Sequence, residues 1–145
     1  MIKLILDMDA GTLQFFKNDE HIHTVSDGLL GHEWQPAVSL DYESEQVTIE
    51  SVAGSGGGNR ESSSCSTDSR ALASATPGWY TVEACFDREE AAQHSHDLQF
   101  SEQNSVVLAN GKACCLLNVG FTSGKVAWEF KLEKDNTGDE ATCFG

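Results

Sequence analysis

The sequence predicts an all-β protein, in which short antiparallel strands enclose one core and a flexible insert is rich in serine and glycine. Two observations support this prediction. Residues 125–133, KVAWEFKLE, alternate between apolar and polar side chains, which is the pattern of a strand with one buried face. The other short apolar runs are separated by Gly, Asn and Asp, which favour turns, as in an antiparallel β-sandwich.

The N-terminal part is expected to form short strands joined by turns. An apolar run begins at Leu4. Asp9, Ala10 and Gly11 follow it as the turn of a hairpin, because Asp and Gly suit the backbone geometry of turns. The later strands of this part are expected in residues 11–16, 34–40 and 45–52. Trp34 begins one of them and is either a core residue or an anchor for a peptide.

The middle of the chain breaks the alternation. Residues 51–77 are rich in Ser and Gly and poor in apolar side chains, which predicts a flexible linker or a long loop. A strand is expected in residues 79–86, WYTVEACF. Asp87 then has the position of a helix cap, and Glu90 lies three residues later, where it would complete a capping box.

The C-terminal part returns to short strands. Residues 104–120, NSVVLANGKACCLLNVG, predict two strands joined at Asn110 and Gly111, because Asn-Gly is a strong signal for a tight hairpin turn. No internal repeat is visible. The chain is therefore expected to divide into residues 1–50, a linker in 51–78, a strand and short helix in 79–97, and residues 98–145.

Composition narrows the possible partners. The chain of 145 residues has room for one domain, and its 23 acidic and 9 basic residues give a formal net charge of −14. This charge argues against nucleic acid or an anionic membrane as a partner, because phosphate binding requires clustered Lys and Arg. No apolar run approaches the ~18 residues of a membrane helix, and a secretory leader is not expected.

The five cysteines are odd in number and lack the spacing of a metal site. Cys114 and Cys115 are neighbours, so on a strand their side chains would point to opposite faces and could not easily coordinate the same metal ion. We therefore expect a reduced, cytoplasmic protein whose thiols are mostly structural.

Other catalytic and metal-binding patterns are incomplete. Two His-x-His pairs occur, at His21/His23 and at His94/His96, and on a strand each pair would face one way. A zinc or copper site needs further ligands, which the sequence does not indicate. The sequence also lacks a Gly-x-Ser-x-Gly motif and a phosphate-binding glycine loop. We therefore expect no metal ion and no cofactor.

The stretch LILDMDAGTL, residues 4–13, offers one enzymatic alternative. Phosphatases of the haloacid dehalogenase type use a nucleophilic aspartate and a second aspartate two residues later, and Asp7 and Asp9 have this spacing. Ala10, however, separates Asp9 from Gly11 and shifts the turn that would direct both carboxylates at one phosphate. The next residues also predict a strand, where an α/β enzyme would have a helix. The hairpin interpretation is therefore preferred.

Two stretches resemble parts of a SPRY domain. LDMDAGTLQFFKND, followed by WQPAVSL, is similar to the second half of the family, and GFTSGKVAWEFKLEKDNTGDEATCFG is similar to the first half. The matching residues of the first stretch are Leu6, Asp7, Asp9, Gly11, Thr12, Leu13, Phe15 or Phe16, Asn18, Pro36, Ala37, Val38, Ser39 and Leu40. Those of the second stretch are Gly120, Ser123, Gly124, Lys125, Trp128 and Glu129.

This resemblance places the two halves in reversed order, and the central strands of the family are missing. The chain is therefore expected to be either a circularly permuted SPRY-like fold or a fragment that spans two successive SPRY domains. In both cases the two halves could pair within one incomplete sandwich whose sheet edges are exposed. A fragment could also lack an independent function.

The resemblance implies a non-catalytic module for protein–protein interaction, of the kind found in large ubiquitin ligases and similar scaffold proteins. Such a module binds a peptide or protein partner through loops that a rigid sandwich presents. Candidate contact residues lie in two loops that the fold itself does not need. They are Asn18, Asp19, Glu20 and His21 in the first, and Lys134, Asp135, Asn136 and Asp139 in the second.

Overall fold

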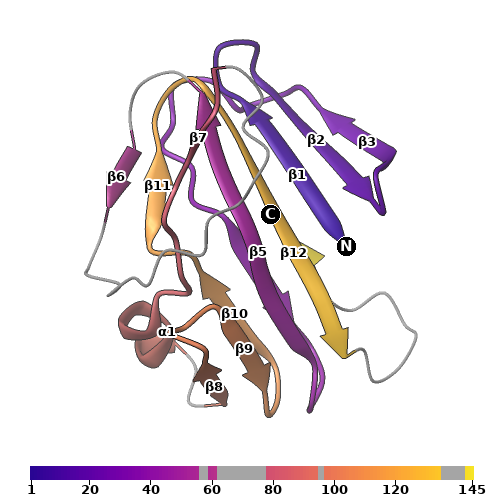
Figure 1. The fold of residues 1–145 in the computed structure, drawn as a ribbon, viewed down its shortest axis with the longest axis vertical. Coiled ribbons are helices and arrows are strands. Elements are labelled where there is room, and N and C mark those ends of the chain that lie inside the picture. The colour runs from indigo at the N-terminus through magenta and orange to yellow at the C-terminus, as the bar shows by residue number, and fades with distance from the viewer. Residues whose placement is uncertain (56–58, 62–77, 95–96, 135–142) are drawn as a thin grey trace.

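The computed structural model describes residues 1–55, 59–61, 78–94, 97–134 and 143–145. These residues form antiparallel sheets with one short helix, which confirms the predicted all-β class (Figure 1). The strands of the large sheet are β1 (Ile2–Asp7), β2 (Thr12–Lys17), β3 (Glu20–Val25), β5 (Gln46–Ser55), β7 (Tyr80–Thr81), β8 (Leu98–Ser101), β9 (Val106–Ala109) and β12 (Lys125–Lys134). Two smaller sheets contain β4 (Ala37–Leu40), β10 (Ala113–Leu116) and β13 (Cys143–Phe144), and β6 (Asn59–Glu61) with β11 (Val119–Phe121).

The large sheet joins the two ends of the chain. Its strand order is β3-β2-β1-β12-β5-β9-β8, with β7 paired to β5. Strand β12, from the C-terminal part of the chain, lies between β1 and β5, so that Trp128 pairs with Leu4 on one side and with Val52 on the other. The expectation that the N-terminal and C-terminal parts pair with each other is therefore confirmed.

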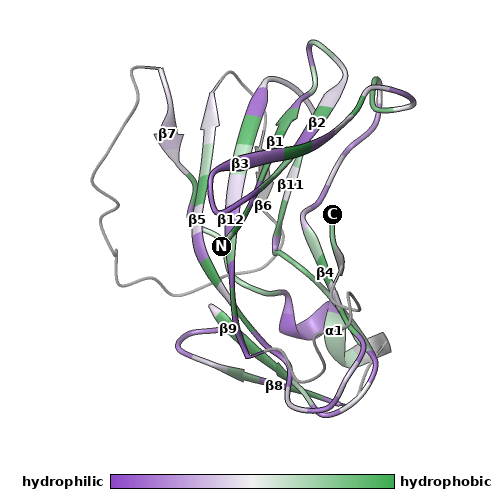
Figure 2. Cartoon of the chain, turned by 90° about the vertical axis from the view of Figure 1, so that its right-hand side faces the viewer, coloured by the Kyte–Doolittle hydropathy of each residue, from purple (hydrophilic) through white to green (hydrophobic). Residues whose placement is uncertain are grey.

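The core lies between the large sheet and the smaller sheets, and Figure 2 shows β4 beside the large sheet. The alternation of β12 is confirmed, because Val126, Trp128 and Phe130 are all buried. Phe130 stacks on Phe86, with ring centroids 6.2 Å apart. The ring centroid of Phe144, in β13, lies 5.3 Å from that of Phe130. The same buried cluster contains Leu4, Leu6, Val38, Leu40, Val47, Val52, Val107, Cys115, Leu117, Val119 and Phe121. Burial of these apolar side chains is the main stabilising contribution to the fold.

The hairpin expected at Asn110 and Gly111 is wrong. β9 pairs with β5 on one edge and with β8 on the other, whereas β10 pairs with β4 in a separate sheet. Neither Asn110 nor Gly111 has the positive φ that the tight turn requires. The Asn110 amide donates instead to the carbonyl of Asp97 at 2.7 Å. Because both edges of β9 are already paired, the chain crosses here to the second sheet.

The predicted helix and its cap are confirmed. Helix α1 (Arg88–His94) begins directly after Asp87, whose Oδ1 atom accepts hydrogen bonds from the amides of Glu89 at 3.1 Å and Glu90 at 3.0 Å. These bonds satisfy two of the donors that a helix leaves unpaired at its N-terminus. The Asp87 amide, which the predicted capping box would pair with the Glu90 side chain, donates instead to the Leu116 carbonyl at 2.8 Å and ties the start of the helix to β10.

The segment between the two halves differs in part from the expectation. β5 continues through Ser55, into the predicted linker, because Ala53 and Gly54 pair with β12 on one side and with β7 on the other. Residues 56–58 and 62–77 of the predicted linker lie outside the described residues. The strand expected in residues 79–86 is reduced to β7 and an isolated bridge of Phe86 to Leu117.

Candidate functional site

The first predicted contact loop is the turn of the β2–β3 hairpin. Asn18 and Asp19 have φ values of 51° and 66°, a left-handed geometry that Asn and Asp tolerate better than most residues. Lys17 and Glu20 pair directly beneath the turn. The side chains of Asn18, Asp19, Glu20 and His21 are all exposed. The structure therefore brings this predicted set together at one accessible corner of the large sheet.

A β-bulge in β3 separates the two histidines of the first His-x-His pair. Phe15 pairs with His23 and Phe16 pairs with His21, so Ile22 is the extra residue. Since Phe15 and Phe16 are neighbours on opposite faces of the sheet, His21 and His23 lie on opposite faces as well. The ring centroids of Phe16 and His21 are 5.3 Å apart, and those of Phe15 and His23 are 6.5 Å apart. The expectation that this pair faces one way is therefore wrong.

The loop after β3, residues 26–34, covers the turn of the first hairpin. Leu29 is buried, whereas the side chain of Leu30 is 61% exposed. Leu30 nevertheless lies directly over Gly11, because a Cβ atom at Gly11 would be only 3.0 Å from the Leu30 Cγ. Gly11 also has a φ of +65°, so this turn requires glycine for its backbone and for the space above it.

Trp34 anchors the end of this loop. Its backbone exchanges two hydrogen bonds of 2.8 Å with Phe121, and its Nε1 atom donates to the Leu29 carbonyl at 2.9 Å. Its ring is partly buried against the core and meets the His32 ring edge-on, with centroids 6.1 Å apart. Of the two interpretations of Trp34, the packing agrees with the core residue. The large apolar side chain that the loop presents to solvent is Leu30.

The first hairpin, with its turn at Asp9, Ala10 and Gly11, is confirmed. Asp7 Oδ1 accepts a hydrogen bond from the Ala10 amide at 2.9 Å, and Asp7 Oδ2 lies 2.8 Å from Lys125 Nζ. The hydrogen bond from Lys125 is the main reason why the pKa of Asp7 is lowered, while burial acts in the opposite direction. Asp7 therefore links this hairpin to β12, and Asp9 is exposed at the turn.

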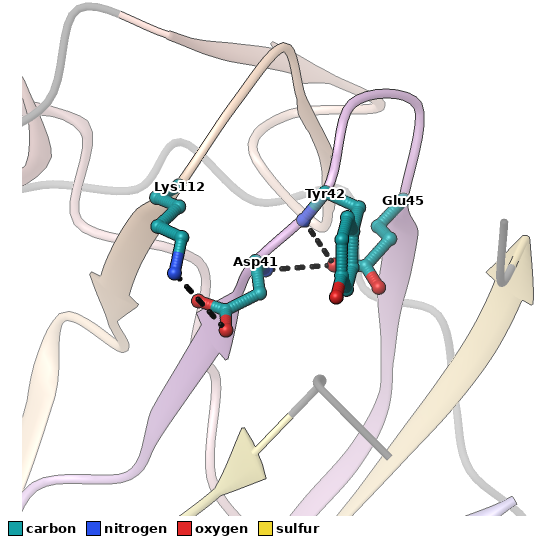
Figure 3. Close-up of polar contacts among 4 residues, drawn as sticks. All are labelled: Asp41, Tyr42, Glu45 and Lys112. Carbon is teal, nitrogen blue, oxygen red and sulfur yellow. Dashed lines mark hydrogen bonds and ion pairs between the residues drawn. The ribbon is translucent and has the colours of Figure 1, made fainter. Parts of the chain in front are cut away.

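A buried carboxylate organises the loop between β4 and β5 (Figure 3). Glu45 is 0% exposed, and its Oε2 atom accepts hydrogen bonds from the amides of Asp41 at 2.9 Å and Tyr42 at 3.2 Å. Its Oε1 atom is buried without a hydrogen-bond partner. Asp41 also lies 3.6 Å from Lys112 Nζ. Sequence reasoning missed this residue, because a Glu between Ser and Gln at a strand start has the appearance of an exposed turn residue.

The remaining predicted residues divide between described and undescribed segments. Lys134 ends β12, and Asp135, Asn136 and Asp139 lie outside the described residues. His94 is the last residue of α1, and His96 is also outside the description. In the described part of the chain, no group of three or more His, Cys, Asp and Glu residues could hold a metal ion.

The adjacent cysteines point to opposite faces of β10, as predicted. Cys114 is exposed, whereas Cys115 is buried. Burial raises the pKa of Cys115 to about 12, and the neighbouring Cys114 and Asp87 act in the same direction. The Cys115 thiol therefore stays protonated at neutral pH and packs as a small apolar side chain in the core.

No protein-family model, curated protein or solved structure matches the chain. Among the described helical residues, no segment has the length and apolar character that would cross a membrane. The two most exposed large apolar side chains of the described residues, Ile22 and Leu30, both lie in residues 18–34. This segment comprises the β2–β3 turn, the rest of β3 and the loop that follows it.

Proposed function

We propose that this chain is a non-catalytic module that binds a peptide or protein partner, with residues 18–34 as its recognition segment. One observation carries the proposal. Of the large apolar side chains that the described structure exposes, Ile22 at 58% and Leu30 at 61% are the two most exposed, and both lie in this segment. Such side chains gain most from burial against a partner.

The surroundings of the recognition segment support this role. A single exposed apolar side chain is ordinary on a protein surface. Here, however, Ile22 lies on an edge strand whose residues from Glu20 to Thr24 are all exposed. Leu30 lies on a loop that is held in place by Leu29 and Trp34. A fixed loop loses little conformational entropy on binding, which favours affinity.

The resemblance to SPRY domains supports a recognition role, and we propose that the chain belongs to that family. We also propose that it acts in the cytoplasm, within a ubiquitin ligase or another scaffold protein. The charge of −14 favours a partner with a basic surface. The phosphatase alternative has less support, because Asp7 is engaged by Lys125 and by the Ala10 amide.

The test is a selection of binding peptides from a random displayed library, followed by measurement of their affinity for variants of the chain. We expect the double variant Ile22→Ser and Leu30→Ser to weaken binding by at least about tenfold. Tyr42→Ser is the matched control, because Tyr42 is 38% exposed but lies in the β4–β5 loop. Both variants must retain the wild-type circular dichroism. Failure to select any binding peptide, or equal losses in both variants, would contradict the proposal.

A further inference from the structure

We propose that the outer edge of β3 binds an extended, positively charged peptide segment as an added β-strand. This inference rests on the proposed recognition function and specifies the class of ligand, a segment with Lys or Arg side chains. The added strand would extend the large sheet beyond β3 and take its affinity from main-chain hydrogen bonds. Side chains on either face of β3 would then determine which segments bind.

The first observation is the position of β3 in the sheet. It is the terminal strand of the large sheet and pairs with β2 on its inner side (Figure 1). Within the described ranges no strand pairs with its outer side. Its residues from Glu20 to Thr24 are exposed, so the described elements cover neither face. An open edge of this kind presents unpaired amide and carbonyl groups to a new strand.

The second observation is that this edge has a bulge but lacks two other common protections of an edge strand. Proteins commonly guard an edge strand with Lys, Pro or a bulge. β3, with the sequence EHIHTV, contains neither Lys nor Pro. Its bulge leaves Ile22 opposite no residue of β2, and the Ile22 side chain is 58% exposed. The bulge interrupts the edge, so only a short peptide segment can pair with it. Ile22 gives that segment an apolar contact.

The third observation is the net negative charge around β3, which favours a positively charged partner. Between Lys17 and Asp27 the chain carries one lysine and three acids, Asp19, Glu20 and Asp27, for a net charge of −2. The whole chain carries −14, so a second copy would bring like charge against this edge. A cationic segment would instead be attracted, and salt would weaken its binding. The edge is therefore better suited to a basic peptide than to self-association.

The experiment uses the complete chain and three short synthetic peptides. One alternates Lys and Val, the second is the same peptide with alternate backbone nitrogens methylated, and the third alternates Glu and Val. We expect the first to shift the NMR signals of the backbone amides of residues 20–25. Methylation should weaken its binding by about tenfold or more, since it removes backbone donors without changing charge. The Glu-Val peptide should not bind.

A pair of variants tests the location. Ile22→Lys adds a positive charge to the β3 edge and should weaken binding of the Lys-Val peptide by about tenfold. Gln99→Lys makes the same change in charge on β8, the opposite terminal strand, at an exposed position, and should leave binding unchanged.

Several outcomes would overturn the inference. One is binding that is insensitive to methylation, and another is a set of shifted amides confined to residues 26–34. A third is binding of selected library peptides without any binding of the Lys-Val peptide, and a fourth is dimerisation of the free chain through β3. In the first three cases the proposed recognition function would stand. Only the absence of all peptide binding would overturn both.

Discussion

At the scale of single residues, two carboxylates show how position decides what an acidic side chain does. Asp7, which has the spacing of an enzymatic nucleophile, is held by Lys125 Nζ at 2.8 Å and by the Ala10 amide at 2.9 Å. Glu45, which has no distinguishing sequence signal, is fully buried and holds a loop through two amides. Both carboxylates make contacts that hold local structure, and only Asp7 lies in a sequence pattern that marks a candidate site.

Asp7→Asn should lower the free energy of unfolding by about 0.5–1 kcal/mol at neutral pH, because it removes a partly buried ion pair with Lys125. The folded-state pKa of Asp7 lies below its ordinary value of 3.8. The stabilisation is therefore fully present above the unfolded-state pKa, and it is lost as the pH falls through the lower folded-state pKa. Urea unfolding of both proteins across this pH range measures the difference.

The control is Asp9→Asn, which makes the same chemical change at an exposed position of the same turn and should leave stability unchanged. Equal effects of the two substitutions would show that the Lys125 pair contributes nothing measurable. The Asp7→Asn protein also tests the enzymatic alternative. If magnesium-dependent hydrolysis of a generic phosphate ester were found in the wild type and lost in Asp7→Asn, Asp7 would be a nucleophile.

Glu45→Ala should cost about 2 kcal/mol of unfolding free energy, since it leaves the amides of Asp41 and Tyr42 without their acceptor. Glu45→Gln should cost less than about 1 kcal/mol, because the amide oxygen can still accept both hydrogen bonds. Denaturant midpoints of the three proteins give the comparison. A loss for Gln as large as that for Ala would mean that the amide oxygen cannot replace the carboxylate as the acceptor of these two bonds.

At the scale of elements, strands with clear alternation and the β1–β2 hairpin were predictable, whereas the exact partners of the other strands were not. β12 was found from its period of two, and α1 was found from Asp87 and Glu90. The Asn110-Gly111 hairpin failed because the pairing of β9 with β5 and β8 is a long-range property that local turn preference cannot reveal. In the candidate site, the turn at Asn18 and Asp19 was predictable from its residue types.

Ile22 and Leu30 were not predictable as the most exposed apolar side chains of the described structure. Their exposure follows from a bulge and from a loop that buries Leu29 and leaves its neighbour outside. Neither feature has a marker in a single sequence, because apolar residues on a short strand or in a loop are usually assigned to the core.

Gly11→Ala should destabilise the first hairpin by about 2 kcal/mol. Its φ of +65° is unfavourable for alanine, and the new Cβ would meet the Leu30 Cγ at 3.0 Å. Gly28→Ala is the matched control, with a φ of +75° and no heavy atom within 4 Å of the new Cβ, and should cost about 1 kcal/mol. Thermal melts measure both. Equal costs would show that Leu30 moves aside freely.

At the scale of the whole molecule, the large sheet is assembled from alternating parts of the chain. β3, β2 and β1 come from the N-terminal part, β12 follows from the C-terminal part, and then β5 and β9 alternate again. The contact between β12 and β5 is the longest strand pairing in the sheet, running from Lys125 with Ser55 to Lys134 with Gln46. Neither part can therefore complete this sheet alone.

This interleaving predicts that the chain folds only as a whole. The complete chain should show a β-rich circular dichroism spectrum and one cooperative thermal transition. Residues 1–61 and 78–145, produced as separate pieces, should each lack such a transition. Each piece lacks the strands that pair with its own: β12 and β9 lie on either side of β5, and β5 and β1 lie on either side of β12.

When produced together, the two pieces should copurify and recover a cooperative melt, because the pairing of β1 and β5 with β12 needs no covalent link. A mixture in which one piece carries Trp128→Asp is the control. This substitution places a charge at a position that is 3% exposed in the core and should prevent assembly. A cooperative melt of either piece alone would contradict the interleaved sheet. Failure of the complete chain to melt cooperatively would favour the interpretation that it is a fragment requiring further strands.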